Sequence, residues 1–294
     1  MKKMTVLIAA ILAVAVILGA AGCGVGQPGM QASNPGAPLT VKVLDVGQGD
    51  ALLVRTPEQV ILIDTGDTPT KERLVGYIKK EGITVIDKLI ITHPHADHIG
   101  GVQAVFDNFT VKQVYDSGQT TTSNMYKQYL VSVQKKKIPF ALLEAGTQLD
   151  VGGGVLFKVL SPEKPFIKGT DSDLNNNSIV LKLIYGNFSM LFTGDAEKEA
   201  EQRMGKSFAA ELKSTVLKAG HHGSSTSSSH GFLKAAEPET VVISLGANNE
   251  YHHPHPSVLK RYSQLKLKVF RTDTDGTVTV SSDGKTYSVT KEKP

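Results

Sequence analysis

Residues 88–98 read KLIITHPHADH and join an apolar run directly to four side chains that can bind a metal ion. The β-branched run at the start of this stretch predicts a buried strand. Imidazole and carboxylate groups are ligands for Zn²⁺ or Mn²⁺, and the loop after the strand supplies His93, His95, Asp97 and His98. His93 and His95 are two residues apart and are expected to face the same way on an extended loop. Asp97 and His98 lie beyond the turn, where they can face a second metal ion.

Short strands and helices alternate through the rest of the chain in two halves. In the first half, helices are expected over 69–80, with Thr68 as the N-cap, and over 99–108 and 123–136. In the second half, a hairpin around Gly186-Asn187 is expected to join two strands. This alternation predicts helices packed on the outer sides of two facing sheets.

The composition narrows the function classes. The 294 residues include 32 Lys and Arg against 28 Asp and Glu, a formal net charge of +4, so no strong basic field attracts nucleic acid by charge alone. Hydrophobic residues make up 40% of the chain, which is enough for a packed core. The single cysteine excludes an internal disulfide framework and a cysteine-rich zinc site.

The N-terminus has the layout of a secretory signal peptide. Lys2-Lys3 is followed by an uncharged run to Leu18 and then by small residues that end at Gly22. The alternative is an uncleaved anchor, because residues 4–22 are just long enough to span a membrane. Both interpretations place the remainder of the chain outside the cytoplasmic membrane.

The only cysteine, Cys23, follows the small residues in a pattern that resembles a bacterial lipobox, with Ala20 where leucine is usual. We therefore expect a signal peptide at 1–22, a lipid-anchored flexible tether at 23–38 and a folded domain at 39–294. The protein would then be exported and held through Cys23 on the outer face of the bacterial cytoplasmic membrane, or secreted. No obligate protein partner is indicated.

The motifs together resemble the metallo-β-lactamase superfamily. The resemblance rests on His93-x-His95-x-Asp97-His98, on Asp64 at an earlier strand end, on Asp195 in the run 192–195, and on His221-His222-Gly223-Ser224. It implies a four-layer αββα sandwich of the α/β class that holds two divalent metal ions, Zn²⁺ or Mn²⁺. Asp195 would bridge the two ions, and Asp64 would orient a ligand histidine.

Further motifs resemble the hydrolase domain of the competence protein ComEC, here standing alone. They are LDVGQGDA at 44–51, NNNS at 175–178, GHHGS at 220–224 and YHHPHP at 251–256. A chain with one N-terminal apolar segment has no channel of its own, so it is not by itself a DNA-transport pore. Asp45 and Asp50 are interpreted as residues of Gly-rich turns, and the alternative is that one of them binds a metal ion directly.

The resemblance also suggests a role for each site residue. The first ion would be held by His93, His95 and Asp195, and the second by Asp97, His98, Asp195 and His222. The family's usual third histidine of the first site is missing, and the run 175–178 stands in its place, which makes Mn²⁺ plausible. Asn176 and Asn177 in this run would face the substrate or the metal ion, or would only cap turns.

Three groups are candidates for the phosphate chemistry. His221 would contact the phosphate or donate a proton, while His222 binds the metal ion. The alternative is that the two histidines have the opposite roles. Ser224 and Ser225 would line a phosphate pocket, or would belong to a flexible surface loop. His255 precedes Pro256 at an expected helix start and would bind substrate or act as a general acid, whereas His252 is expected to be exposed.

The resulting hypothesis is an extracytoplasmic metal-dependent hydrolase. It would be a phosphodiesterase, most plausibly a nuclease that cleaves DNA with a hydroxide activated by two metal ions, with Asp97 helping to orient the nucleophile. The alternatives are a cell-wall phosphodiesterase such as a phosphocholine esterase, and a non-catalytic membrane-anchored binding protein. Metal content would distinguish the last alternative from the two enzymes.

Overall fold

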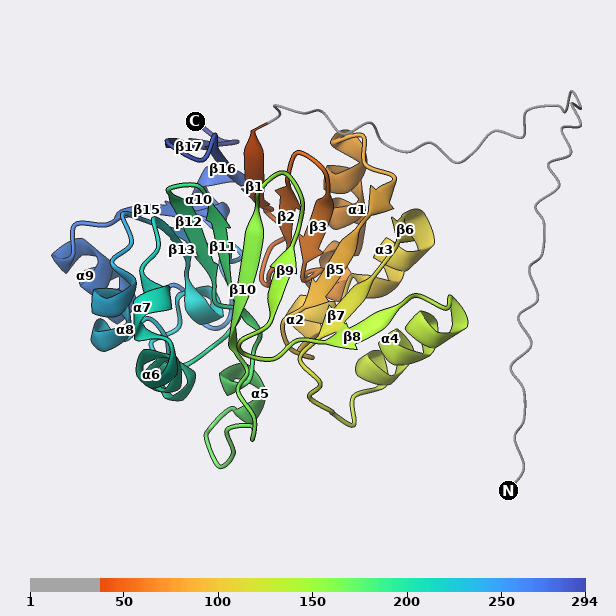
Figure 1. Ribbon diagram of the computed structural model, residues 1–294, viewed down its shortest axis with the longest axis horizontal. Helices are drawn as coiled ribbons and strands as arrows, with labels where there is room; N and C mark the ends of the chain where they lie inside the picture. Colours follow the sequence, from red (N-terminus) through yellow and green to blue (C-terminus); the bar gives the residue numbers. More distant parts are fainter. Residues whose placement is uncertain (1–37) are drawn as a thin grey trace, which may run out of the picture. The chain divides into compact units, whose positions relative to one another are not determined.

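Two β-sheets face each other and carry helices on their outer sides (Figure 1). The structure, a computed structural model, describes residues 38–294. The expected signal peptide, most of the tether and Cys23 lie outside the described residues. Within residues 38–294, no helix combines the length and the apolar composition that crossing a membrane requires.

The first sheet has eight strands, and two strands from the C-terminal end of the chain form one of its edges. They are β17 (Tyr287–Lys291), β16 (Val278–Ser282), β1 (Leu39–Val43), β2 (Leu52–Arg55), β3 (Val60–Ile63), β5 (Lys88–Ile91), β7 (Val114–Asp116) and β8 (Phe140–Leu142). Strands β3, β5 and β7 run parallel to one another, whereas β1 pairs antiparallel with both β2 and β16.

The second sheet has seven strands and uses the second half of the chain. Its order is β15 (Lys268–Arg271), β14 (Thr240–Ile243), β13 (Val216–Lys218), β12 (Phe188–Phe192), β11 (Val180–Tyr185), β10 (Leu156–Ser161) and β9 (Gln148–Asp150). Strands β11 and β12 form the hairpin expected around Gly186-Asn187, which confirms that prediction. The short strands β4 (Val85–Ile86) and β6 (Thr110–Val111) pair separately.

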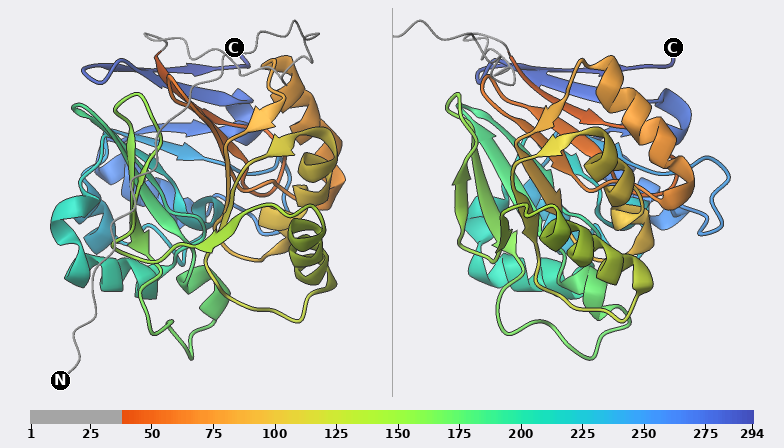
Figure 2. Two further views of the ribbon diagram at one scale, coloured as in Figure 1. Left: turned by 45° about the vertical axis from the view of Figure 1, so that its right-hand side comes forward. Right: turned by 90° about the vertical axis from the view of Figure 1, so that its right-hand side faces the viewer.

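Three clusters of buried apolar side chains build the four layers. The central cluster lies between the sheets and includes Val41, Ile61, Phe157 and Phe192. Helices α1 (Lys71–Lys80), α3 (Val102–Asn108) and α4 (Asn124–Lys135) cover the outer face of the first sheet, as Figure 2 shows. Helices α6 (Lys198–Ser207), α7 (Ala209–Leu212), α8 (His230–Ala236) and α9 (Pro256–Gln264) cover the second sheet. The predicted αββα sandwich is confirmed.

The helices near the metal-ligand motif begin and end differently from the prediction. The single helix expected over 99–108 is divided into α2 (Ala96–Ile99) and α3, so Asp97 and His98 lie within a helical turn. The division falls at Gly100-Gly101. Glycine is needed here because a Cβ atom on Gly101 would lie 2.3 Å from the carbonyl oxygen of Thr65.

Two further boundaries are corrected. The first helical turn of the helix expected over 69–80 is a 3₁₀ segment at Thr68–Thr70, capped by the carboxylate of Asp67 rather than by Thr68. In the run 175–178, Asn175 and Asn176 are the last two residues of α5 (Asp173–Asn176), and Asn177 is its C-cap. The remaining short helix is α10 (Thr272–Asp275).

Candidate metal centre

The predicted ligand residues come together where strands of both sheets end. Asp64 follows β3 and the loop 92–98 follows β5, and these two parallel strands belong to the first sheet. Asp195 follows β12 and His222 follows β13, which are parallel neighbours in the second sheet. Because parallel strands end at the same edge of a sheet, each sheet presents its polar side chains on one side. The two sets then meet across the sandwich.

Four side chains, Asp97, His98, Asp195 and His222, form one group whose ligand atoms all lie within 4.8 Å of one another. His222 Nε2 is 3.1 Å from Asp97 Oδ2. Asp195 Oδ1 is 3.4 Å from His98 Nε2 and 3.6 Å from His222 Nε2. Three of these atoms, His98 Nε2, Asp195 Oδ1 and His222 Nε2, are buried without a hydrogen-bond partner. A divalent cation would satisfy all three, so the donor set fits a metal site.

His93 and His95 form a second pair beside this group. His93 Nε2 and His95 Nδ1 face each other at 3.0 Å, and His93 Nε2 is 3.8 Å from Asp195 Oδ2. The two oxygens of Asp195 therefore face different histidines, Oδ1 toward His98 and His222 and Oδ2 toward His93. This is the placement that a carboxylate shared between two ions requires.

The charges of the centre favour a cation. Burial alone would raise the pKa of Asp195, but His98, His222 and His221 lower it well below its usual range. Burial alone would lower the pKa of His222, but the carboxylates of Asp195, Asp50 and Asp97 raise it to about 10. The carboxylates therefore favour positive charge at this position, which a divalent ion would also supply.

In the pair His93 and His95, by contrast, the pKa values are lowered. Burial lowers the pKa of His93 well below its usual value, and burial also lowers the pKa of His95. Both rings are therefore neutral near pH 7. Neutral imidazole is the form that binds a metal ion.

Asp64 holds the His98 ring in place. Its carboxylate lies 2.8 Å from His98 Nδ1 and accepts hydrogen bonds from the Thr92 amide at 2.8 Å and the Thr92 hydroxyl at 2.7 Å. Because the Nδ1 side is held by Asp64, His98 turns Nε2 toward Asp195. This carboxylate–histidine arrangement fixes ring orientation in metal sites.

Asp50 and Lys218 were not identified from the sequence as part of the site. Asp50 Oδ2 lies 2.8 Å from Lys218 Nζ, both side chains are buried, and Asp50 Oδ1 lies 3.4 Å from His222 Nδ1. The carbonyl oxygen of Ser244 holds the same His222 nitrogen at 2.9 Å. Burial would raise the pKa of Asp50, but Lys218 and His222 lower it to about 2. Asp50 therefore has a role beyond that of a turn residue, because it pairs with Lys218 and faces His222.

A signal for this pair was present in the sequence. Lys218 is the last residue of the otherwise apolar strand β13, three residues before His221, and a buried lysine requires a carboxylate partner. The loop that carries Asp50 approaches closely at Gly49, where a Cβ atom would lie 2.2 Å from the carbonyl oxygen of Asp97.

His221 lies at the mouth of the centre. Its Nδ1 is 3.1 Å from Glu197 Oε1, its Nε2 is 3.8 Å from Asp195 Oδ2, and its side chain is 26% exposed. His221 and His222 belong to a 3₁₀ turn, Gly220–Gly223, with left-handed backbone angles rather than to a strand end. From this turn both rings face Asp195, His221 through Nε2 near Oδ2 and His222 through Nε2 near Oδ1.

The asparagine run supports the site from a distance. Asn175 Nδ2 donates to Glu197 Oε1 at 3.1 Å, which places it behind His221. Asn176 is buried and bonds Thr170, Glu199 and Ala200. Asn177 is buried and bonds the backbone of Ile167 and Asp173. The amides of Asn176 and Asn177 are thus used within the protein, which favours the alternative that they cap turns over the one in which they face substrate or metal.

The serine loop is ordered by internal contacts. The Ser224 hydroxyl is buried and lies 3.0 Å from the Thr226 hydroxyl, whereas Ser225 is exposed. The Ser225 amide donates to His255 Nδ1 at 2.8 Å, which leaves the other ring nitrogen of His255 for a ligand. Glu201 accepts hydrogen bonds from two further amides of this loop.

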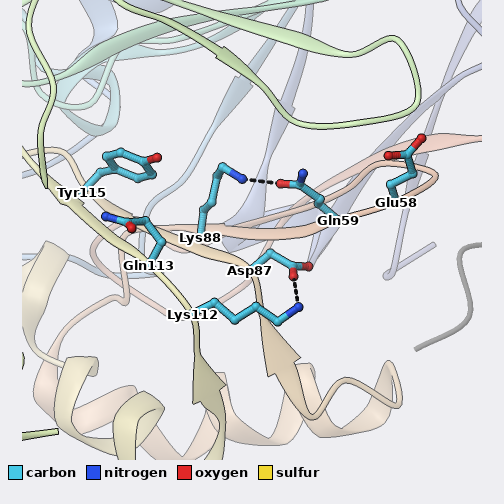
Figure 3. A pocket seen from close by; sticks show the side chains of 7 residues that line it. All are labelled: Glu58, Gln59, Asp87, Lys88, Lys112, Gln113 and Tyr115. Carbon is cyan, nitrogen blue, oxygen red and sulfur yellow. Dashed lines mark hydrogen bonds and ion pairs between the residues drawn. The ribbon is translucent and has the colours of Figure 1, made fainter. Parts of the chain in front are cut away.

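A polar groove lies at the other end of the first sheet and is separate from the metal centre. It encloses about 450 Å³ and is lined by Glu58, Gln59, Asp87, Lys88, Lys112, Gln113 and Tyr115 (Figure 3). Lys112 pairs with Asp87 at 2.7 Å, and Lys88 contacts Gln59. Lys88 begins β5, whereas the histidine loop follows the end of that strand.

Comparison with known proteins agrees with this arrangement. The family model of the metallo-beta-lactamase superfamily matches residues 44–247. ComE operon protein 3 of Bacillus subtilis is 34% identical over 81% of this chain and 32% of its own length. Competence protein ComA of Neisseria gonorrhoeae is 34% identical over 80% of this chain and 31% of its own length. The chain thus spans about a third of these relatives.

A solved structure shows the same fold. The diiron β-hydroxylase CmlA of Streptomyces venezuelae matches 85% of this chain and 55% of its own with a TM-score of 0.56, at 13% sequence identity.

Proposed function

Because the chain belongs to the metallo-β-lactamase superfamily, we propose that it is an exported metal-dependent phosphodiesterase and that its substrate is DNA. The observation that carries the proposal is the group of buried ligand atoms on His98, Asp195 and His222 that have no hydrogen-bond partner and that a bound cation would satisfy. The similarity to two competence proteins supports DNA as the substrate. A part in DNA uptake is included in the proposal because competence protein ComA is among the relatives. Both relatives extend well beyond the third of their length that this chain matches.

Two divalent ions would be bound by neighbouring residue sets. His93, His95 and Asp195 would hold the first, and Asp97, His98, Asp195 and His222 the second. When bound, the ions would activate water and neutralise charge on the phosphodiester. The superfamily binds divalent metal ions, and we propose Mn²⁺ over Zn²⁺ because no third histidine completes the first set among the described residues.

The protein's own groups would orient the reactants. Asp97, whose side chain is 28% exposed, lies where it can orient the attacking water. His221 is fixed by Glu197 with Nε2 toward Asp195, so it can contact the phosphate or give a proton to the leaving oxygen. His255, held by the Ser225 amide, is the alternative donor. Of the two serines, the exposed Ser225 is the better candidate for a phosphate contact.

The test is a hydrolysis assay of the purified protein with DNA, RNA and bis(p-nitrophenyl) phosphate. Each substrate is incubated with Mn²⁺, with Zn²⁺ and with a chelator. We expect metal-dependent cleavage of DNA and of the nitrophenyl ester. Cleavage of choline-phosphate esters without cleavage of DNA would favour the cell-wall phosphodiesterase, and absence of bound metal would favour the binding protein.

The proposed location depends on Cys23. A signal peptide at 1–22 followed by a lipidated cysteine would place the domain on the outer face of the membrane, joined through the tether 23–38. Mass spectrometry of the cell-derived protein should then show a diacylglyceryl-modified N-terminal Cys23. An intact Met1 peptide, or a soluble form that begins after Cys23, would contradict this.

A further inference from the structure

A row of three rings leads from the metal centre to the surface. His253 lies against His222 with ring centroids 6.3 Å apart and 29° between the planes. Tyr251 lies against His253 at 5.7 Å and 26°. His253 is buried, whereas Tyr251 is 54% exposed, so the row ends in an aromatic ring that is open to solvent.

The loop that carries Tyr251 is braced against the metal centre. The Asn249 side chain donates to the carbonyl oxygens of Gly246 at 2.9 Å and His253 at 2.7 Å, and accepts from the His253 amide at 2.9 Å. The His255 amide donates to the Gly223 carbonyl at 3.0 Å, next to His222. The segments on both sides of Tyr251 are therefore fixed before any ligand binds, and the ring itself stacks on His253, which reduces the entropy lost on binding.

Exposure of this ring is unusual for the part of the chain that the structure describes. Its exposed large hydrophobic side chains are Val131, Phe140, Leu142 and Tyr251. Of these, Tyr251 alone stacks on the row of rings beside the metal centre. A planar aromatic ring beside a phosphodiesterase site offers a stacking surface for a nucleobase, and every base has a face that can use it.

We propose that Tyr251 is the stacking platform for the unpaired nucleobase next to the scissile phosphate, with His253 as its support. The inference rests on the proposed function and narrows its substrate to nucleic acid with an unstacked base. Bases within a duplex already stack on their neighbours, so single strands or strand ends satisfy this requirement. The net charge of only +4 gives the phosphate backbone little general attraction, so base stacking would carry much of the recognition.

The experiment compares three phosphodiesters that differ only in their bases. They are the thymidine dinucleotide and its two analogues in which one base is replaced by hydrogen. We expect kcat/KM of the wild type to fall about tenfold or more when the base on one particular side is absent. Tyr251→Ala should lose a similar factor on the full dinucleotide and almost nothing on that analogue, whereas Tyr251→Phe should behave like the wild type.

Phe140→Ala is the matched control, because Phe140 is another exposed aromatic residue on β8. Metal content is measured for every variant. Equal cleavage of all three substrates by the wild type would overturn the stacking role while leaving the phosphodiesterase intact. An equal loss on all substrates in Tyr251→Ala, or a loss of bound metal, would show a structural role and also overturn it.

A binding measurement keeps the inference independent of turnover. Stacking on Tyr251 should quench 2-aminopurine in a short single-stranded oligonucleotide with wild type and Tyr251→Phe, but not with Tyr251→Ala. If no phosphodiester is cleaved with any metal, the proposed function fails, and the quenching alone decides whether Tyr251 binds bases. Quenching that persists in Tyr251→Ala would contradict the inference.

Discussion

Replacing Lys218 by methionine should strongly destabilise the protein. The Lys218–Asp50 ion pair is 2.8 Å long, and its two side chains are 0% and 1% exposed. The substitution leaves the Asp50 carboxylate buried without its ammonium partner, with His222 Nδ1 at 3.4 Å as the remaining ion-pair contact. Removal of one partner from a buried pair typically costs about 3–5 kcal/mol, because the other charge is left uncompensated.

The pH dependence of this loss follows from Asp50. In the wild type its pKa is about 2, below the ordinary 3.8, so the carboxylate contributes stability above pH 4 that disappears as the pH falls toward 2. Without Lys218, the pKa of Asp50 rises, because burial raises it and only His222 and His98 still oppose this effect. The variant should therefore differ most from the wild type near pH 7 and least under acidic conditions, where Asp50 is protonated in both proteins.

Urea unfolding followed by circular dichroism measures the effect, with chelator present so that metal binding does not contribute. Lys182→Met is the control, since Lys182 is a partly exposed residue of β11, and it should change stability by less than about 0.5 kcal/mol. The double variant Asp50→Leu with Lys218→Met removes both charges and should recover most of the stability. Its metal affinity should remain about 10–100-fold lower, because His222 has lost an orienting carboxylate. A loss below about 1 kcal/mol in Lys218→Met, or no recovery in the double variant, would refute the reasoning.

Three other substitutions test the remaining arguments. Asp195→Ala should lower turnover by about 10³ or more with an unchanged circular dichroism spectrum, because both proposed ions share this carboxylate; substantial remaining activity would exclude that role. Activity in metal titrations of the apo-protein should be higher with Mn²⁺ than with Zn²⁺, and Asn177→His should lower stability without shifting this preference, since the Asn177 amide bonds Ile167 and Asp173. Full turnover with zinc alone would contradict the first expectation, and a shift toward zinc the second. Burial raises the pKa of Asp116 from 3.8 to about 6, so its contribution to stability falls as pH rises through this window. Asp116→Asn should therefore be more stable than wild type at pH 8 by up to about 3 kcal/mol and not at pH 3, as measured by urea unfolding.

The layers of the fold and the ligand loop could be predicted from the sequence, whereas the residues that surround the ligands could not. The run 88–98 predicted a strand followed by metal ligands because both signals are local, one in hydrophobicity and one in residue type. The Gly186-Asn187 hairpin was equally local. The division of the helix at Gly100-Gly101 was missed, because it depends on the approach of Thr65 from another strand end.

Long-range contacts account for the other differences. Asp50 meets Lys218 only after the two sheets pack, so its local sequence indicated nothing beyond a turn. Asn176 and Asn177 stood at the position of a missing ligand, and only the contacts with Thr170, Ile167 and α6 reveal their structural use. The motif therefore predicted which segments of the chain lie near the metal centre, whereas the hydrogen-bond partners of each side chain determine its role.

The metal centre is assembled from residues of both sheets. Asp97 and His98 come from the first sheet, and Asp195 and His222 from the second, so the main group of ligands exists only when the sandwich is closed. The carboxylate that orients His222, however, belongs to the first sheet, at Asp50.

Hydrogen bonds also cross between the sheets beside the centre, from the Ile179 amide to the Thr92 carbonyl at 2.9 Å and from the Ser244 hydroxyl to the Gly49 carbonyl at 2.7 Å. A bound cation would strengthen the same junction, since it binds the folded arrangement and not the unfolded chain. The geometry of the centre therefore depends on more than the residues of the HxHxDH motif. Asp50, Asp64 and Glu197, which lie outside that motif, orient the rings of His222, His98 and His221.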